Sequence, residues 1–429
     1  MHTTDFNYML TLLKAGVLPA TGCTEPIAVA YSAAITKKHA PGELQSLEIW
    51  VDHGLYKNGA KVGIPGTSER GLELAAAMGY VAGKSELQLR VIENISPEAV
   101  QLAKQLVQQG KVKVQIKQDC DNLYIETLLL TTTEKVRVVT LNKHLNIISV
   151  EKGEQLTEIT IAKTQINEEK QQLQSLELQD FYRFTREVQI DELAFLEEGL
   201  RLNLLIAEEG LKRSKGISKA IAGLMDEGVL HEGLMFYAQK LCSAASEARM
   251  SGSNLPVMTI AGSGNQGIVV FLTILAAGEK LKASRERVLR ALALSALLTI
   301  YIKSYTGTLS AMCGCAIAAG TAASAGVVYL MDGSEAEISG AILNMIGTLA
   351  GMICDGAKEG CAYKLALSTG WAVQSALLAM NGAAVCSTDG ILTGDFKQLL
   401  VNLGAICNYG MVHTDKIILE IMERGDSQV

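Results

Sequence analysis

Two long stretches without a single charged residue, 306–331 and 365–388, constrain this chain most. Their lengths, 26 and 24 residues, would each let a helix cross a bilayer. In the first stretch, however, sixteen positions are Gly, Ala, Ser or Thr, which gain little free energy on transfer into lipid. No belt of aromatic residues flanks either stretch. We therefore expect fully buried helices that pack closely through small residues, in a protein that does not associate with a membrane.

The first half of the chain has a different pattern, in which apolar and polar residues alternate. Alternation with a period of two is typical of strands that bury one face. It predicts strands at residues 47–51, 87–91, 112–116, 124–130, 136–141 and 147–150. Apolar residues at helical spacing predict helices at residues 5–13, 27–35, 69–78 and 97–109. This half is therefore expected to be a mixed α/β region with an open sheet.

The composition changes between residues 163 and 186, where Gln, Glu and Lys dominate and the strand pattern ends. A chain of 429 residues exceeds one ordinary hydrophobic core, so two domains are expected. The prediction is an α+β fold, with an α+β domain over residues 1–190 and a large, mostly α-helical domain over residues 191–429. The helices within residues 1–40 are expected to pack on the helical domain.

The charge and the N-terminus narrow the class of protein. The net charge is −7 and no basic run is present, which argues against a nucleic-acid partner. The first residues lack a basic segment followed by an apolar one, so no secretory signal is predicted and a cytoplasmic location is expected. The nine cysteines are then expected to be reduced thiols that bind metal or act in catalysis.

Cys354 and Cys361 are the first candidates for a metal site. On an unbroken helix their spacing would separate them by about 10 Å, too far for two ligands of one compact centre. Gly356 and Gly360 lie between them and allow the chain to turn back. The spacing therefore predicts a non-helical loop between the two cysteines.

Cys313 and Cys315 are the second candidates. Residues two positions apart point to different sides in regular structure, so one thiol of the pair is expected to face the centre. Cys313 is preferred, because Gly314 after it would let a bulky cofactor approach the backbone. Three thiolates suit a [4Fe–4S] cluster with an open iron or a catalytic zinc with one exchangeable position. Spacing alone also leaves open that these are small buried hydrophobic residues.

Cys23 has a different context, because an Ala-rich helical run follows it and Pro26 suits the first position of that helix. Free N–H groups and the dipole at a helix start lower the pKa of a thiol. Cys23 is therefore a candidate base or nucleophile. The alternative is a loop cysteine with no chemical role.

Residues 262–267, Gly-Ser-Gly-Asn-Gln-Gly, match a dinucleotide-binding pattern. Helical spacing over residues 285–302, where that fold needs a second strand, argues against a dinucleotide site. A Gly/Ser/Asn turn that opens a helix still binds anions well, and a substrate carboxylate would fit it.

Three segments together carry a resemblance: Thr-Gly-Cys-Thr-Glu-Pro from residue 21, Ser-Ala-Met-Cys-Gly-Cys from residue 310, and Cys-Asp-Gly-Ala-Lys-Glu-Gly-Cys from residue 354. With these, the chain resembles the L-cysteine desulfidases, relatives of the iron–sulfur L-serine dehydratase α-subunit, over nearly its whole length. The resemblance implies a [4Fe–4S] cluster. Its three ligands would be Cys354, Cys361 and one of Cys313 and Cys315, and Cys23 would be the proton acceptor.

The resemblance also implies a reaction on a small amino-acid substrate. L-Cysteine would lose sulfide by β-elimination and give pyruvate, ammonia and hydrogen sulfide; dehydration of L-serine by the same route is the nearest alternative. An open iron would act as a Lewis acid and Cys23 as the base. Ser263, Asn265 or Lys358 would hold the substrate carboxylate, and a homodimer is the expected assembly. Two other classes stay open, a small-solute transporter and an iron–sulfur sensor.

Overall fold

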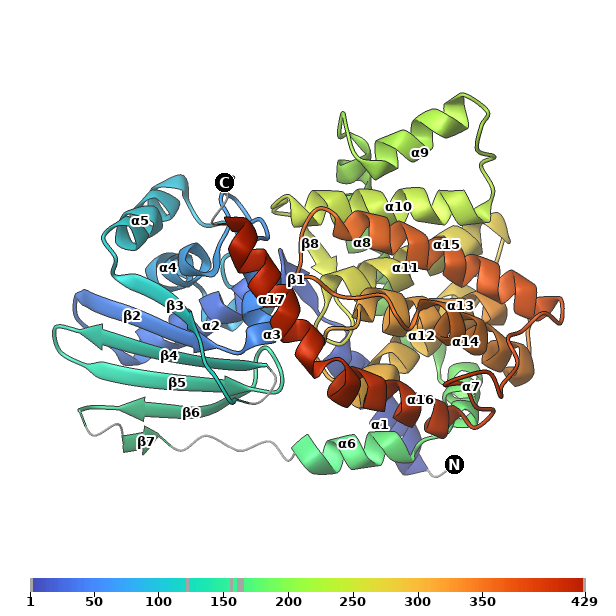
Figure 1. The fold of residues 1–429 in the computed structure, drawn as a ribbon, viewed down its shortest axis with the longest axis horizontal. Helices are drawn as coiled ribbons and strands as arrows, with labels where there is room; N and C mark the ends of the chain where they lie inside the picture. Colours follow the sequence, from blue (N-terminus) through green and yellow to red (C-terminus); the bar gives the residue numbers. More distant parts are fainter. Residues whose placement is uncertain (1–2, 121–122, 155–156, 160–165, 427–429) are drawn as a thin grey trace.

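The computed structural model describes residues 3–120, 123–154, 157–159 and 166–426. Figure 1 shows a lobe built on a sheet beside a larger lobe built of helices. The strands of the large sheet all lie before residue 160, and the rest of the chain is mostly helical. The predicted α+β class is confirmed.

Six strands form one mixed sheet in the order β3-β2-β4-β5-β6-β7. Only β2 and β3 run parallel, and the other neighbours are antiparallel. The strands are β2 (Leu44–Val51), β3 (Val112–Ile116), β4 (Tyr124–Thr131), β5 (Lys135–Leu141), β6 (Ile147–Lys152) and β7 (Thr157–Ile159). β2, β3, β4, β5 and β6 confirm five of the six strands that the alternating pattern predicted.

One face of the sheet is buried against helices and the other faces solvent. α2 (Thr24–His39) and α4 (Leu72–Ala82) share a core with the inward residues of the strands, such as Ile49 and Leu129. α5 (Pro97–Gln108) packs outside α4. On the open face, Arg137 bonds Glu126 and Glu151 on the neighbouring strands at 2.6 and 2.8 Å. The predicted open sheet is therefore confirmed.

The strand predicted at residues 87–91 is wrong, because residues Ser85–Arg90 form a 3₁₀ helix. Gln88 has a φ of 52°, and the Lys84 N–H donates to the Val91 carbonyl at 2.9 Å, so the segment closes on itself. Leu89 and Val91 still enter the sheet-lobe core from this turn. Alternating apolar residues thus reflect burial of one side here, without an extended backbone.

The second core is formed by long helices that pack around α11 (Gly264–Lys280), which is buried on nearly all sides. The surrounding helices are α8 (Leu196–Leu211), α10 (Leu234–Met250), α12 (Arg285–Thr306), α13 (Thr321–Leu330) and α15 (Cys361–Met380), and α14 (Glu335–Leu349) packs on α13 and α15. Small residues set the helix distances: a Cβ at Gly210 on α8 would lie 1.9 Å from the Ala244 carbonyl oxygen on α10. Close packing through small residues is as expected.

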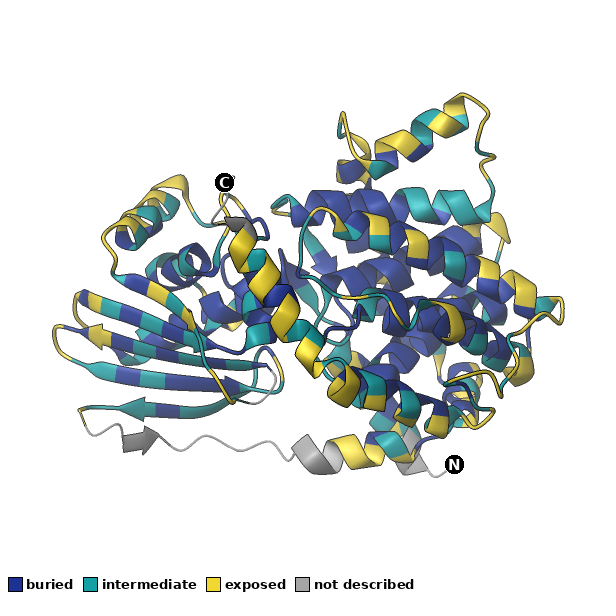
Figure 2. Ribbon diagram, viewed as in Figure 1, coloured by how far each residue is buried: buried dark blue, intermediate teal, exposed yellow. Residues whose placement is uncertain are grey.

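The prediction of fully buried helices in the two uncharged stretches is only partly right. Residues 307–313 form a loop, and the chain then continues through a π-helix, Cys315–Gly320, into the buried α13. α15 is exposed along one face, where Tyr363 and Leu367 are 61% and 52% exposed, because it packs on the lobe from outside (Figure 2). Within the described ranges only α12 is long and apolar enough to cross a membrane, and 78% of its apolar window is buried inside the protein.

Segments from both ends of the chain cross between the lobes. α1 (Thr3–Gly16) lies in the helical core through Met9 and Leu13, whereas α2 packs on the sheet. α6 (Ile166–Ser175) and α7 (Leu178–Glu187) also join the helical core. α16 (Phe396–Ala405) packs on the helical lobe, and α17 (Val412–Asp426) returns across the junction to α3 (His53–Gly59) of the sheet lobe (Figure 1). The two cores are therefore discontinuous in sequence.

Asp52 should contribute strongly to the stability of the sheet lobe. Its carboxylate accepts the Leu55 N–H at the start of α3 (3.0 Å) and the Tyr124 N–H of β4 (2.8 Å), joining two elements. We expect Asp52→Ala to lower the free energy of unfolding by about 2 kcal/mol, because a cap and a second charge-assisted bond are lost. Calorimetric melting would measure this. Asp395→Ala, at the exposed start of α16, removes a single capping bond and should cost clearly less.

Candidate active site between the lobes

A pocket with about 760 Å³ of empty space, including its mouth, lies where the two lobes meet. The sheet lobe contributes the start of α2 and Asn58 of α3. The helical lobe contributes the start of α11, Lys303 of α12, and two loops. All five cysteines that the sequence singled out line this pocket: Cys23, Cys313, Cys315, Cys354 and Cys361. Residues that are far apart in sequence thus share one cavity.

Two loops and the helix starts that follow them hold the four pocket cysteines of the helical lobe. The Cys313 N–H donates to the Met352 carbonyl at 2.8 Å and the Cys354 N–H to the Ala311 carbonyl at 2.6 Å, so the loops pair as a short antiparallel bridge. The chain between Cys354 and Cys361 is not helical, and Cys361 is the first residue of α15. The predicted break is confirmed.

Gly356 allows this break, because its φ is +89° and a Cβ would lie 2.5 Å from the Lys57 carbonyl oxygen.

Cys313 and Cys315 both line the pocket, because the backbone between them is irregular: Cys313 lies in the loop and Cys315 begins the π-helix. A hydrogen bond from Cys315 lowers the pKa of Cys313 to about 6, while the same contact and burial raise the pKa of Cys315. The expectation that only one of the pair faces the centre is therefore wrong.

Gly314 makes room for two side chains of the helical lobe. A Cβ there would lie 2.7 Å from Gln266 Nε2 and 3.3 Å from Lys303 Nζ. Lys303 is buried and has no hydrogen bond or ion pair within the described part of the chain. Burial lowers its pKa, and the neighbouring thiols oppose that shift. Charging a buried amine that has no partner needs an anion beside it, so Lys303 favours an anionic occupant of this wall.

The thiols do not converge on one point. Over the described ranges, no three Cys, His, Asp or Glu side chains lie close enough together to bind one metal ion. Zinc needs such convergence, with Zn–S distances of about 2.3 Å. The cysteines of an iron–sulfur cluster bind different iron atoms and stand further apart. The donor set, all sulfur on one wall, therefore fits a cluster better than zinc.

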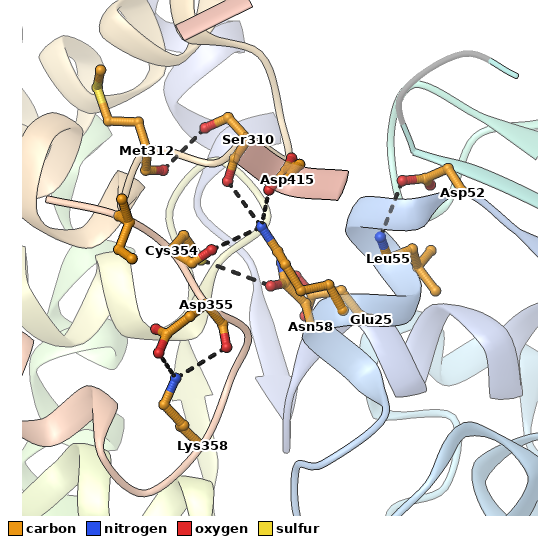
Figure 3. Close-up of polar contacts among 12 residues, drawn as sticks. Glu25, Asp52, Leu55, Asn58, Ser310, Met312, Cys354, Asp355, Lys358 and Asp415 are labelled. Carbon is orange, nitrogen blue, oxygen red and sulfur yellow. Dashed lines mark hydrogen bonds and ion pairs between the residues drawn. The ribbon is translucent and has the colours of Figure 1, made fainter. Parts of the chain in front are cut away.

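A chain of hydrogen bonds holds Cys23 in the pocket lining. Cys23 is the residue before the first turn of α2, as predicted, although Pro26 is the third residue of that helix and not the first. Its Sγ donates to Glu25 Oε2 at 2.9 Å, and Asn58 Nδ2 donates to Glu25 Oε1 at 3.2 Å. Figure 3 shows that Asn58 also contacts Cys354, whose Sγ lies 3.8 Å from Asn58 Oδ1.

The expected lowering of the Cys23 pKa is wrong. Burial raises the pKa of this thiol well above its ordinary value, and the negative charge of Glu25 raises it further. These effects outweigh the helix start and the opposing charge of Arg249. Burial also acts to raise the pKa of Glu25, but His144 and the Cys23 thiol lower it below its usual range, so Glu25 is a carboxylate.

The start of α11 forms another part of the pocket lining. β1 (Pro19–Thr21), just before Cys23, pairs with β8 (Pro256–Met258), just before the Gly-Ser-Gly-Asn-Gln-Gly turn. Ser263 caps α11, and both Ser263 and Asn265 line the pocket. Lys358 does not line it, because its ammonium is paired with Asp355 at 2.6 Å (Figure 3).

Lys57 joins both cysteine-bearing loops to the sheet lobe. Its ammonium donates to the Cys354 carbonyl at 2.9 Å and the Ser310 carbonyl at 3.4 Å, and it forms an ion pair with Asp415 of α17 (Figure 3). The Lys57 side chain is only 1% exposed. One buried charge on α3 therefore holds the two cysteine-bearing loops and α17 in place.

Sequence reasoning assigned no role to several pocket residues: Glu25, Asn58, His144, Arg249, Gln266, Lys303 and Lys364. Glu25 and Gln266 lie inside motifs that the sequence had already singled out, whereas His144, Arg249, Lys303 and Lys364 lie in segments without a motif. Lys303, a charge that directly follows the mostly apolar residues 291–302, was a further available signal.

Comparison with known proteins identifies the family. Residues 86–420 match the family model described as the serine dehydratase alpha chain. The chain belongs to the serine dehydratase alpha-chain family. This confirms the resemblance and indicates a lyase of the dehydratase type, in a family associated with iron–sulfur chemistry.

Relatives of similar length cover almost the whole chain. A UPF0597 protein of Clostridium tetani is 43% identical over 416 residues, which are 96% of this chain and 97% of that protein. UPF0597 proteins of Alkaliphilus oremlandii and Parabacteroides distasonis are 41% and 39% identical, covering 97% and 98% of this chain and 98% and 99% of their own lengths. The family match includes Cys313, Cys315, Cys354 and Cys361, whereas Cys23 precedes the matched residues.

Glu25→Gln should make Cys23 more acidic. The amide can still accept the thiol hydrogen bond, but the negative charge that raises the Cys23 pKa is gone. We expect the pH at which iodoacetamide alkylates Cys23 to fall, read by mass spectrometry of the Cys23 peptide under anaerobic conditions. The exposed Cys386 in the same sample should keep its profile. An unchanged Cys23 profile would contradict the role of Glu25.

Asp415→Ala should destabilise the protein by about 3 kcal/mol, because the buried Lys57 ammonium loses its counterion. The loss is measurable as a lower calorimetric melting temperature. Glu420→Ala is a matched control on the same helix, since it breaks only an exposed pair with Arg424. That variant should change stability by less than about 0.5 kcal/mol. Equal effects of the two substitutions would refute the importance of Lys57.

Proposed function

We propose that the chain is a [4Fe–4S]-dependent L-cysteine desulfidase, which converts L-cysteine to pyruvate, ammonia and hydrogen sulfide. One observation carries the proposal: a single pocket is lined both by Cys23 and by four cysteines of the helical lobe, Cys313, Cys315, Cys354 and Cys361. A base and a sulfur-liganded Lewis acid that reach the same substrate are what β-elimination needs.

Cys354, Cys361 and one of Cys313 and Cys315 would hold the cluster, and Gly314 and Gly356 keep their loops compact. When bound, the cluster supplies a Lewis-acidic iron for the departing sulfur. The unpaired ammonium of Lys303 beside this wall suits its negative charge. The bridge between the loops fixes the relative positions of Cys313 and Cys354.

Cys23 would remove the Cα proton of the substrate. Its thiol must first lose its own proton, and Glu25 is a carboxylate that already accepts that hydrogen bond at 2.9 Å. Because the pKa of Cys23 is raised, its thiolate is a stronger base than an exposed thiolate. The carbon–sulfur bond then breaks, sulfide leaves, and the aminoacrylate product tautomerises and hydrolyses to pyruvate and ammonia.

Ser263 and Asn265, at the start of α11, are proposed to contact the carboxylate of the substrate. Lys358 is not retained in this role, because it pairs with Asp355 away from the pocket lining. The second candidate function is dehydration of L-serine, which the description of the matching family favours. Both reactions use the same base and the same wall and differ only in the leaving group.

Pyruvate release from L-cysteine and from L-serine, measured anaerobically on iron-reconstituted protein, tests the proposal. We expect a higher kcat/KM for L-cysteine. Turnover of L-serine alone would replace the proposal with the dehydratase. If protein with about four irons per chain turned over neither L-cysteine nor L-serine, both candidate functions would be contradicted.

Cys23→Ser should abolish turnover and spare the cofactor. The hydroxyl is a much weaker acid than the thiol, so kcat should fall by at least about 10³-fold, within the range of general-base contributions. Iron content and the visible absorption spectrum should match those of the unaltered protein. Cys386→Ser, on an exposed loop, is the matched control and should keep full activity. Loss of colour in Cys23→Ser would instead place this thiol among the cluster ligands.

A further inference from the structure

Arg249, the penultimate residue of α10, lies buried at the start of α11 and is only 2% exposed. Its Nε and Nη2 donate to the Gly22 carbonyl at 3.1 and 2.8 Å, and its Nη1 donates to Asn265 Oδ1 at 2.9 Å. The guanidinium packs on the backbone of Gly264, where a Cβ would lie 2.5 Å from the Arg249 Cζ. A fixed positive charge therefore stands beside the helix start that the pocket exposes.

The site has unused hydrogen-bonding capacity. A guanidinium has five N–H groups, and the three bonds to Gly22 and Asn265 leave two. His144 Nε2 and Gln266 Oε1, which also belong to the pocket lining, have no partner among the described residues, although His144 and Gln266 are only 5% and 4% exposed. Buried polar atoms without partners are rare in proteins. Both atoms belong to the lining of the pocket that the start of α11 also lines, which indicates a polar ligand there.

We propose that Arg249, together with the start of α11, binds the α-carboxylate of the substrate and so restricts the enzyme to free α-amino acids. A helix start and a guanidinium both favour a carboxylate, and charge-assisted bonds are the strong ones. The identity of the ligand as an amino acid rests on the proposed function. The presence of an anion site rests on the residues alone.

The same contacts orient the substrate. Arg249 bonds the Gly22 carbonyl, one residue before Cys23, so a carboxylate bound at Arg249 lies next to the base. The Cα proton then faces the Cys23 side of the pocket, and the Cβ substituent extends toward the thiol wall. Lys303 lies against Gly314, between Cys313 and Cys315.

The carboxylate requirement can be tested with ligands that cannot react. L-Alanine has no leaving group on Cβ, L-alaninamide lacks the carboxylate charge, and ethylamine lacks the carboxylate altogether. We expect isothermal titration calorimetry on anaerobic, iron-reconstituted protein to show L-alanine binding at least about 30-fold tighter than the other two, equivalent to about 2 kcal/mol. Equal binding of L-alanine and L-alaninamide would overturn the proposal, as would no binding of L-alanine.

Variants locate the effect at Arg249. Arg249→Gln should weaken L-alanine about 30-fold and leave ethylamine unchanged, and Arg249→Lys should restore part of the loss. Arg201→Gln, which removes an exposed guanidinium on α8, is the matched control and should bind normally. Full L-alanine affinity in Arg249→Gln would overturn the proposal. If that variant does not fold, the ligand series on unaltered protein decides alone.

The outcomes separate this proposal from the proposed function. Arg249-dependent binding of L-alanine, without turnover of L-cysteine or L-serine, would keep the carboxylate site and reject the reaction. Pyruvate release from L-cysteine, with L-alaninamide bound as well as L-alanine, would keep the reaction and reject the site.

Discussion

The buried ammonium of Lys57 is the contact on which the geometry of the site depends. A charge that is 1% exposed is costly unless it is neutralised and fully hydrogen-bonded. Asp415 supplies the opposite charge, and the carbonyls of Ser310 and Cys354 supply the remaining acceptors. These four residues come from α3, α17 and the two cysteine-bearing loops. The favourable state of Lys57 is therefore available only when both loops and the last helix are in place.

The charges of the pocket are divided between its two ends. Arg249 and Glu25 lie at the Cys23 end, where the cation lowers and the anion raises the pKa of the thiol. Lys303 lies beside Cys313, Cys315 and Cys354, against Gly314. Cationic groups at both ends suit a substrate carboxylate at one and an anionic thiolate assembly at the other. The carboxylate of Glu25 stands between them, bonded to Cys23 and to Asn58.

Local sequence patterns correctly predicted the structural features that depend only on residues adjacent in the chain. The alternating strands, the break made possible by Gly356 and Gly360, and the helix that begins after Cys23 all follow from a few adjacent residues. Burial is not such a property. The pKa of Cys23 was expected to fall because only the helix start is visible in the sequence, whereas the burial that raises it arises from tertiary packing.

The residues that sequence reasoning missed follow the same rule. His144 follows β5 of the sheet, Arg249 ends α10, and Lys303 is near the end of α12. Each lies in a segment with no motif, and only the meeting of the lobes brings them to one pocket. The prediction that Lys358 binds the substrate carboxylate fails for the converse reason. Lys358 does not line the pocket, because it pairs with Asp355, three residues earlier on the same loop. A motif indicates which loop is functional, but the charges that complete the site come from elsewhere.

The range of the family match divides the proposed chemistry into two parts. Residues 86–420 contain the thiol wall, Arg249 and the start of α11, which together would bind the cofactor and the carboxylate. Cys23, Glu25 and Asn58, which would act on the Cα proton, precede that range. The β1–β8 pair and the bonds from Arg249 to Gly22 hold the two parts together. Proton removal therefore depends on how the segment that carries Cys23 and Glu25 packs against residues 86–420. Weakening the β1–β8 pair should impair catalysis and leave the four thiols of the pocket in place.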